Sequence, residues 1–135
     1  MTDSMTIWLN QAGRYPLLSR SEITELARIR DKHEPGSRRY LKAINTICRH
    51  NLKLVHRVVT RYLATRSRAR LQDPGTLDLL QQGFFGLRRA AEKFAPSRGF
   101  TFSTYAVNWI RQSVTRYAAV NEEVIYVPEA TVREL

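Results

Sequence analysis

The chain has 135 residues, enough for one domain with a hydrophobic core of its own. Its 22 Lys and Arg outnumber its 12 Asp and Glu, and the net charge of +10 predicts a polyanionic partner, either nucleic acid or an anionic membrane surface. No apolar run approaches the roughly 20 residues that span a bilayer, and the N-terminal MTDSMTIWLN lacks the layout of a signal peptide. We therefore expect a cytoplasmic protein without a membrane partner.

The first part of the chain predicts two helices. A short helix around Met5–Gln11 should end before Pro16, which interrupts helical backbone. Ser19 and Glu22 have the spacing of a capping box, in which each side chain accepts a hydrogen bond from the other residue's backbone. A second helix therefore begins at Ser19 and should stop by Pro35-Gly36.

The middle of the chain predicts two longer helices joined by a loop. From Ser37 to about Leu63 the apolar residues follow one face of a single long helix, and Cys48 lies on that face as a small core residue. The basic stretch from Ala64 to Gly75 predicts a loop, which we interpret as a solvated linker in preference to an extra phosphate-binding arm. The next helix extends from Thr76 to before Pro96, with a buried stripe formed by Leu79, Leu80, Gly83, Leu87, Ala90 and Phe94.

The segment from Phe100 to Tyr117 separates into two faces when it is placed on a helix. One face is apolar or small and can be buried: Ala106, Ile110, Ser113, Val114 and Tyr117. The other face carries aromatic rings, amides and a cation: Tyr105, Asn108, Trp109, Gln112, Thr115 and Arg116. Rings stack on unpaired bases, amides hydrogen-bond base edges and arginine holds phosphate, so this face suits single-stranded nucleic acid. The alternative is an ordinary amphipathic helix whose Tyr and Trp complete a core.

The string FSTYAVNWIRQSVTR, Phe102 to Arg116, resembles the promoter-melting helix of bacterial sigma factors of the primary, or sigma-70, family. DLLQQGFFGLRRAAEKF, NLKLVHRVVTRY and GRYPLLSRSEITELARIR resemble the segments that precede it in that family. The resemblance implies an all-α fold, a compact bundle of about five helices in one structural domain. Residues 1–36 resemble region 1.2, residues 37–121 the core helices of region 2 with a basic loop at 64–75, and residues 122–135 an extended tail at the start of region 3.

The family resemblance implies that the chain recognises and melts an A·T-rich −10-like promoter element by capturing bases of its non-template strand. The positions that match DNA-binding residues are Phe94, Phe100, Phe102, Tyr105, Asn108, Trp109, Gln112, Thr115, Arg116, Asn51, Leu54 and Arg14. Tyr105 matches the residue that stacks on a flipped adenine, and Asn51 and Leu54 match residues around a second flipped base, a thymine. Asn108 departs from the family, because it replaces the first member of a tryptophan pair.

The same resemblance implies binding to bacterial RNA polymerase core through the coiled coil of its largest subunit. The matching positions are Asp78, Gln81, Gln82, Phe84, Phe85 and Arg88. Phe84 and Phe85 point about 100° apart on a helix. One of them is therefore expected to be exposed as an interface anchor while the other packs inward, the alternative being that both are buried.

No catalytic constellation, metal-ligand spacing or cofactor motif is present in the sequence, and we interpret the chain as a binding protein without enzymatic activity. The chain ends soon after Pro128, at the lead-in to further sigma domains. This ending resembles minimal phage-encoded late-transcription sigma factors, which rely on a separate co-activator, and a fragment of a longer sigma factor is the competing explanation. Two other functions stay open: a polymerase-binding inhibitor or appropriator, and a stand-alone helical DNA-binding regulator.

Overall fold

The computed structural model describes residues 4–65 and 75–134, with side chains described only between Ile7 and Val120. Within these residues the chain is helical and contains no strand, which confirms the all-α prediction. The elements are α1 (Ser4–Ala12), α2 (Arg20–Lys32), α3 (Arg38–Arg49), α4 (Leu52–Ala64), α6 (Thr76–Lys93), the 3₁₀ turn η1 (Pro96–Arg98) and α7 (Phe102–Glu134). None of the described helices is both long and apolar enough to cross a membrane.

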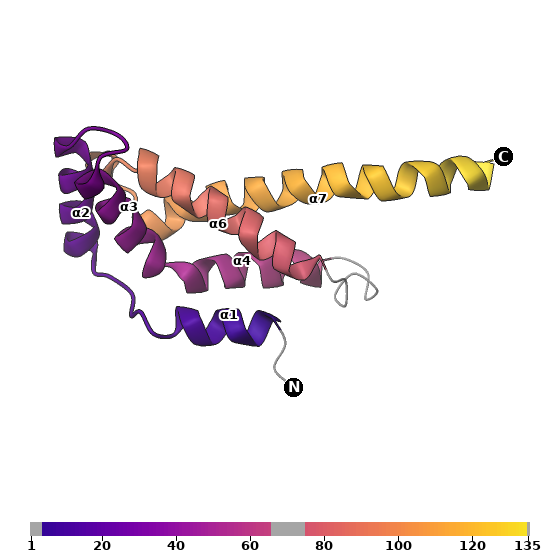
Figure 1. Ribbon diagram of the computed structural model, residues 1–135, viewed down its shortest axis with the longest axis horizontal. Helices are drawn as coiled ribbons and strands as arrows, with labels where there is room; N and C mark the ends of the chain where they lie inside the picture. Colours follow the sequence, from indigo (N-terminus) through magenta and orange to yellow (C-terminus); the bar gives the residue numbers. More distant parts are fainter. Residues whose placement is uncertain (1–3, 66–74, 135) are drawn as a thin grey trace.

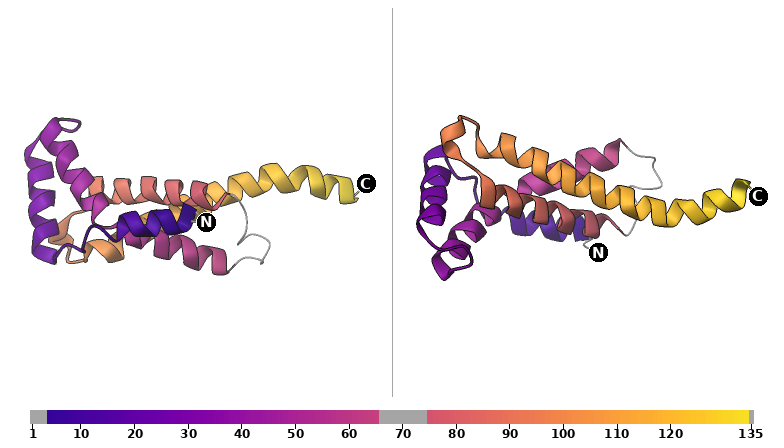
Figure 2. Two further views of the ribbon diagram at one scale, coloured as in Figure 1. Left: turned by 60° about the horizontal axis from the view of Figure 1, so that its bottom comes forward. Right: turned by 90° about the horizontal axis from the view of Figure 1, so that it is seen from above.

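The helices form a bundle in which α6 packs along α7 and both contact α4 (Figure 1). α2 and α3 pair with each other at one end of the bundle, and α1 lies beside α4. Both views in Figure 2 show that α7 continues beyond the other helices and carries the C terminus away from them. The connection between α6 and α7 lies at the opposite end of the bundle, next to α2, where Arg20 is hydrogen-bonded to Gly99 (Figure 1).

Glycines allow α6 and α7 to approach closely. A Cβ atom placed on Gly86 would lie 2.6 Å from the carbonyl oxygen of Trp109 and 2.9 Å from the Cα atom of Ile110. Gly83 plays the same part towards α4, since a Cβ atom there would lie 2.8 Å from Cγ1 of Val55. Real Cβ atoms do not come this near to other atoms, so glycine is required for this packing distance. The close contact determines where Trp109 lies relative to α6.

The start of α2 has the predicted capping box. The Ser19 hydroxyl accepts a hydrogen bond from the backbone N–H of Glu22 at 3.2 Å, and the Ser19 backbone N–H donates to the Glu22 carboxylate at 2.8 Å. The bond from the Ser19 backbone, followed by the one from its side chain, lowers the pKa of Glu22. Local hydrogen bonding thus determines where α2 begins and where Arg20, its first residue, is held.

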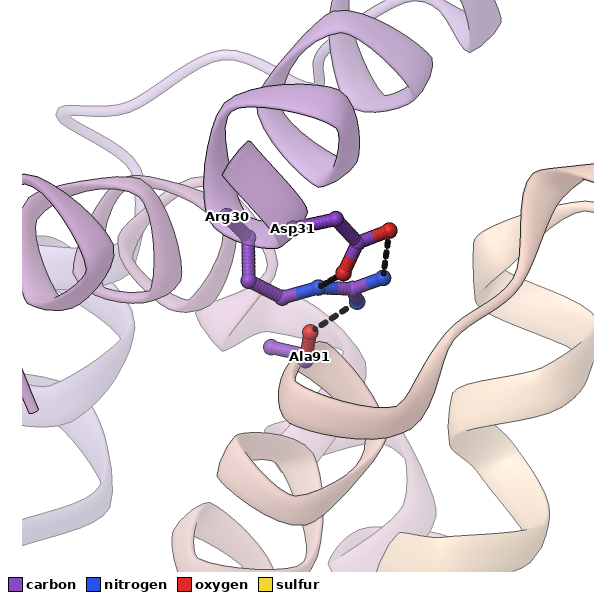
Figure 3. Close-up of polar contacts among 3 residues, drawn as sticks. All are labelled: Arg30, Asp31 and Ala91. Carbon is purple, nitrogen blue, oxygen red and sulfur yellow. Dashed lines mark hydrogen bonds and ion pairs between the residues drawn. The ribbon is translucent and has the colours of Figure 1, made fainter. Parts of the chain in front are cut away.

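The end of α2 is tied to the last turn of α6 by Arg30, which is buried (Figure 3). Its Nη1 donates a 2.8 Å hydrogen bond to the carbonyl oxygen of Ala91. Nε and Nη2 bind the Asp31 carboxylate at 2.8 and 3.1 Å. The carbonyl oxygens in the last turn of a helix have no hydrogen-bond donor within the helix. Arg30 supplies a donor to one of them, the carbonyl oxygen of Ala91.

The single helix predicted from Ser37 to Leu63 is wrong, because α3 and α4 are separated at His50 and Asn51. The backbone N–H of Asn51 bonds to the carbonyl of Cys48, three residues back, and its φ and ψ of −122° and 18° are not helical. Its Nδ2 donates to the carbonyl of Ile47 at 2.8 Å. An asparagine side chain that bonds to a nearby carbonyl competes with the helical pattern, which explains the break.

The extended tail predicted at 122–135 is also wrong over its described part, because the backbone of α7 stays helical to Glu134. The loop predicted at 64–75 lies almost entirely outside the described residues.

Candidate nucleic-acid interface

A series of four aromatic rings runs from the end of α6 along α7. The ring centroids of Phe94 and Phe102 lie 5.3 Å apart with planes at 80°. Phe94 and Tyr105 are 5.6 Å apart at 45°, and Tyr105 and Trp109 are 6.2 Å apart at 60°. These are the offset and edge-to-face arrangements that aromatic rings favour. The structure therefore brings together four of the residues predicted to bind DNA.

The four rings differ in how much surface they offer to a ligand. Phe94 and Phe102 are each 3% exposed, so neither has a free face on which a base could stack. Tyr105 and Trp109 are half-buried and pack on the core with part of their surface free. Phe94 and Phe102 thus pack beneath the surface and hold the Tyr105 ring, whereas Tyr105 and Trp109 form the part of the site that a ligand can contact.

A hollow of about 210 Å³ adjoins Tyr105 at the connection between α6 and α7. It is lined by Lys93, Phe94, Ala95, Arg98, Phe100 and Tyr105. Phe100 is 55% exposed, so the hollow has an aromatic residue on its rim as well as in its wall. The volume is smaller than that of sites for drug-sized ligands, and the two cations are suited to an attached phosphate. The predicted residues Phe94, Phe100 and Tyr105 meet here.

A second hollow, of about 220 Å³, adjoins Asn51. Its lining comes from the start of α2 and the connection before it, and from the segment between α6 and α7: Leu17, Leu18, Arg20, Ile23, Thr24, Asn51, Phe94, Pro96, Phe100, Thr101, Phe102 and Ser103. Leu54, predicted to lie beside Asn51 in such a pocket, is 4% exposed and does not line it. Arg14 lies in the turn after α1 and lines neither hollow.

The outer face of α7 is polar, as its periodicity predicts. The side chains of Asn108, Gln112, Thr115 and Arg116 are exposed, while Ala106, Ile110 and Val114 on the opposite face are buried. Three cations that sequence reasoning missed lie beside the predicted residues. Lys93 and Arg98 line the hollow at Tyr105, and Arg111 is exposed three residues after Asn108. Helical spacing from Asn108 would have found Arg111, whereas the other two depend on the tertiary structure.

The adjacent phenylalanines of α6 behave as predicted, one outward and one inward. Phe85 is 56% exposed, whereas Phe84 is partly buried and packs on the core. Both line an apolar groove of about 590 Å³ that lies between α1, α4 and α6. The groove lining contains no charged residue: Ile7, Trp8, Gln11, Leu52, Leu77, Gln81, Phe84 and Phe85. The Trp8 indole N–H donates to the carbonyl of Leu52 at 3.4 Å and holds α1 against α4.

The other residues predicted to bind polymerase lie outside this groove. Asp78 interacts with Tyr117, where partial burial first and the Asp78 carboxylate second raise the pKa of the tyrosine. Arg88 pairs with Glu92 at 4.0 Å, and Gln82 is half-buried. Of the six residues predicted to bind polymerase, Gln81, Phe84 and Phe85 line this groove.

Comparisons with known proteins agree with the helical arrangement. Residues 47–122, more than half of the chain, match the family model for Sigma-70 region 2. The RNA polymerase sigma factor SigA of a Bacillus species is 40% identical over 129 residues, which cover 95% of this chain and 30% of that protein. SigA of Lactococcus lactis subsp. cremoris is 36% identical over 126 residues (93% and 32%), and RpoS of Coxiella burnetii is 34% identical over 134 residues (99% and 34%).

This chain spans about a third of the length of these relatives. The family match begins before Asn51 and ends after the polar face of α7, so it includes every predicted site residue except Arg14. The matched segment includes α4, α6 and the part of α7 that carries the polar face, whereas α1 and α2, which also line the groove and the hollow at Asn51, precede it. On the combined grounds of sequence and fold, the chain belongs to the sigma-70 family and contains region 2 of that family.

Proposed function

We propose that this chain is a promoter-specificity subunit that binds bacterial RNA polymerase core and melts an A·T-rich −10-like promoter element. The observation that carries the proposal is the half-buried Tyr105 ring, which is supported by Phe94 and lies beside a base-scale hollow with two cations. The relatives are named RNA polymerase sigma factors, which supports the same partner. The chain itself performs no chemistry in this proposal.

Base capture follows from the geometry around Tyr105. Removing a base from a duplex costs a few kcal/mol, and stacking on one aromatic ring returns about 1–3 kcal/mol. A base in the hollow stacks on Tyr105 while Lys93 and Arg98 contact the phosphates beside it. The ring is already fixed by its neighbours, so little conformational entropy is lost when the base enters.

The polar face of α7 meets the duplex edge next to the captured base. Asn108 and Gln112 are exposed and carry amides, which can both donate to and accept from a base edge. Arg111 and Arg116 are exposed cations on the same side of the helix and contact the backbone. Binding to this face positions the DNA so that the base next to it enters the hollow at Tyr105.

Polymerase docks on α6 and the adjoining groove. Phe85 is a large exposed aromatic residue, the type that most often acts as an interface anchor. The groove beside it has no charged lining residue in a chain of net charge +10, so nucleic acid is a poor occupant and an apolar side chain of a protein is a good one.

Substitution of Tyr105 tests the proposal in the reconstituted holoenzyme. Tyr105→Ala should reduce open-complex formation about 5- to 150-fold, the equivalent of one stacking contact of about 1–3 kcal/mol. Tyr105→Phe keeps the ring and should retain most of the melting. Permanganate footprinting measures the unpaired thymines, and a pull-down with core polymerase should be unchanged in both variants.

Two results would replace the proposal with another function. Nanomolar, sequence-specific binding to intact duplex by the chain alone would favour a stand-alone DNA-binding regulator. Run-off transcription that falls when the chain is added to core polymerase and promoter, with polymerase binding intact, would favour an inhibitor or appropriator.

A further inference from the structure

The hollow at Asn51 is built from parts of the chain that are far apart in sequence. Leu17, Leu18 and Arg20 form one wall, and residues between Phe94 and Ser103 form the other. The first wall has one hydrophobic anchor, because Leu17 is 72% exposed and only the partly buried Leu18 packs against the core. The residues from Pro16 to Ser19 also lie outside any helix. Specific contacts must therefore hold this wall in position.

His50 provides the shorter of two hydrogen bonds that reach this wall and its surroundings. Its Nδ1 lies 2.7 Å from the carbonyl oxygen of Pro16. A carbonyl only accepts hydrogen bonds, so Nδ1 carries the proton and donates. The His50 ring also meets the Tyr15 ring edge to face, with centroids 5.4 Å apart and planes at 69°. The Arg49 guanidinium lies over Tyr15, 5.4 Å from its ring centroid.

A second hydrogen bond joins the two walls of the hollow directly. Nη2 of Arg20 donates to the carbonyl oxygen of Gly99 at 3.2 Å, between segments separated by 79 residues. Gly99 has a φ of +87°, a left-handed conformation that favours glycine at this turn. Both this bond and the His50–Pro16 bond are exposed to solvent, and the Arg20 bond is the longer of the two.

We infer that His50 is a positioning residue that sets the width of the hollow at Asn51 and thereby its discrimination between bases. The inference rests on the proposed function together with the family resemblance at Asn51, by which this hollow receives a second unpaired base of the −10 strand. His50 precedes Asn51 directly and reaches across to Pro16, so it ties the Leu17–Leu18 wall to the residue at the base of the hollow. Loss of the contact frees the wall and leaves the hollow without a defined size.

The first experiment measures the wall without DNA. Amide hydrogen exchange of Tyr15, Leu17, Leu18 and Ser19 is compared in the isolated wild-type chain, His50→Ala, His50→Asn and His56→Ala, since Pro16 has no amide hydrogen. We expect exchange at least fivefold faster in His50→Ala alone, because Asn retains a donor close to the position of Nδ1. His56 is a half-buried histidine of α4, with no side-chain hydrogen bond among the described contacts, and provides the matched control. Unchanged exchange in His50→Ala would overturn the inference.

The second experiment measures base discrimination by the holoenzyme. Single-stranded −10 oligonucleotides, each with one base replaced, are titrated with holoenzyme containing each variant. His50→Ala should lose at least fivefold discrimination at one position only, and His50→Asn should restore it. A uniform loss at every position would indicate a merely structural role and overturn the inference. Faster exchange in His50→Ala, combined with no base preference at any position in the wild type, would instead overturn the proposed function.

Discussion

The guanidinium of Arg30 donates a 2.8 Å hydrogen bond to the carbonyl oxygen of Ala91, 61 residues further along the chain. Ala91 lies in the last turn of α6, three residues before Phe94 and the connection to α7. The bond therefore fixes the end of α2 against the point where both hollows begin. Stability and site geometry are linked through this one contact.

Arg30→Ala should lower the free energy of unfolding by about 1–3 kcal/mol, because the buried Ala91 carbonyl loses its partner. Urea denaturation followed by circular dichroism measures the change. Arg28→Ala is the control on the same helix, since the Arg28–Glu25 pair is exposed (side chains 59% and 53% exposed) and solvent-exposed ion pairs contribute little to stability. Equal losses in both variants would show that the bond to Ala91 does not stabilise the fold.

Asn108→Trp should make promoter melting easier on linear templates, since Asn108 is exposed beside Trp109 and a new indole there can stack at the edge of the duplex. The gain expected from one stacking contact is about 1–3 kcal/mol, seen as more open complex in permanganate footprints. Asn108→Ala distinguishes stacking from base reading, because it removes the amide without adding an indole. If the amide reads a base, both substitutions should lower activity and weaken preference at one position of the element.

Ile7→Glu should weaken binding to core polymerase at least tenfold, because it places a charge in the apolar groove that adjoins Phe85. Leu9→Glu is a matched control on the same helix, since Leu9 is 42% exposed, close to the 51% of Ile7, and does not line the groove. Titration of labelled chain with core polymerase gives the two affinities. Equal affinities for the two variants would remove the groove from the docking surface.

Burial of Cys48 gives the protein a pH dependence at high pH. The thiol is 2% exposed, and burial raises its pKa from 9.0 to about 12. Because the folded pKa lies above the unfolded one, the stabilisation is complete below pH 9 and is lost as the pH rises towards 12. The difference in unfolding free energy between the wild type and Cys48→Ala should therefore shrink between pH 8.5 and 10.5, measured by urea denaturation. A constant difference would show that the thiol has the same pKa in the folded and unfolded states, so that burial does not raise it.

Local sequence signals predicted most of the helices and their faces. Ser19 and Glu22 mark the start of α2 because a capping box involves only residues three positions apart. Ala106, Ile110 and Val114 are buried as their spacing predicts, and Phe85 is exposed beside the inward Phe84. These features depend on helical periodicity, which any amphipathic sequence displays without reference to its neighbours.

The tertiary structure alone decided how these faces become sites. The burial of Phe102, the hollow at Asn51 and the groove between α1, α4 and α6 depend on packing between distant segments. The contacts of His50 with Pro16 and of Arg20 with Gly99 likewise join residues 34 and 79 positions apart. Periodicity within one helix carries no information about such pairs, because their energies exist only after the helices have packed together.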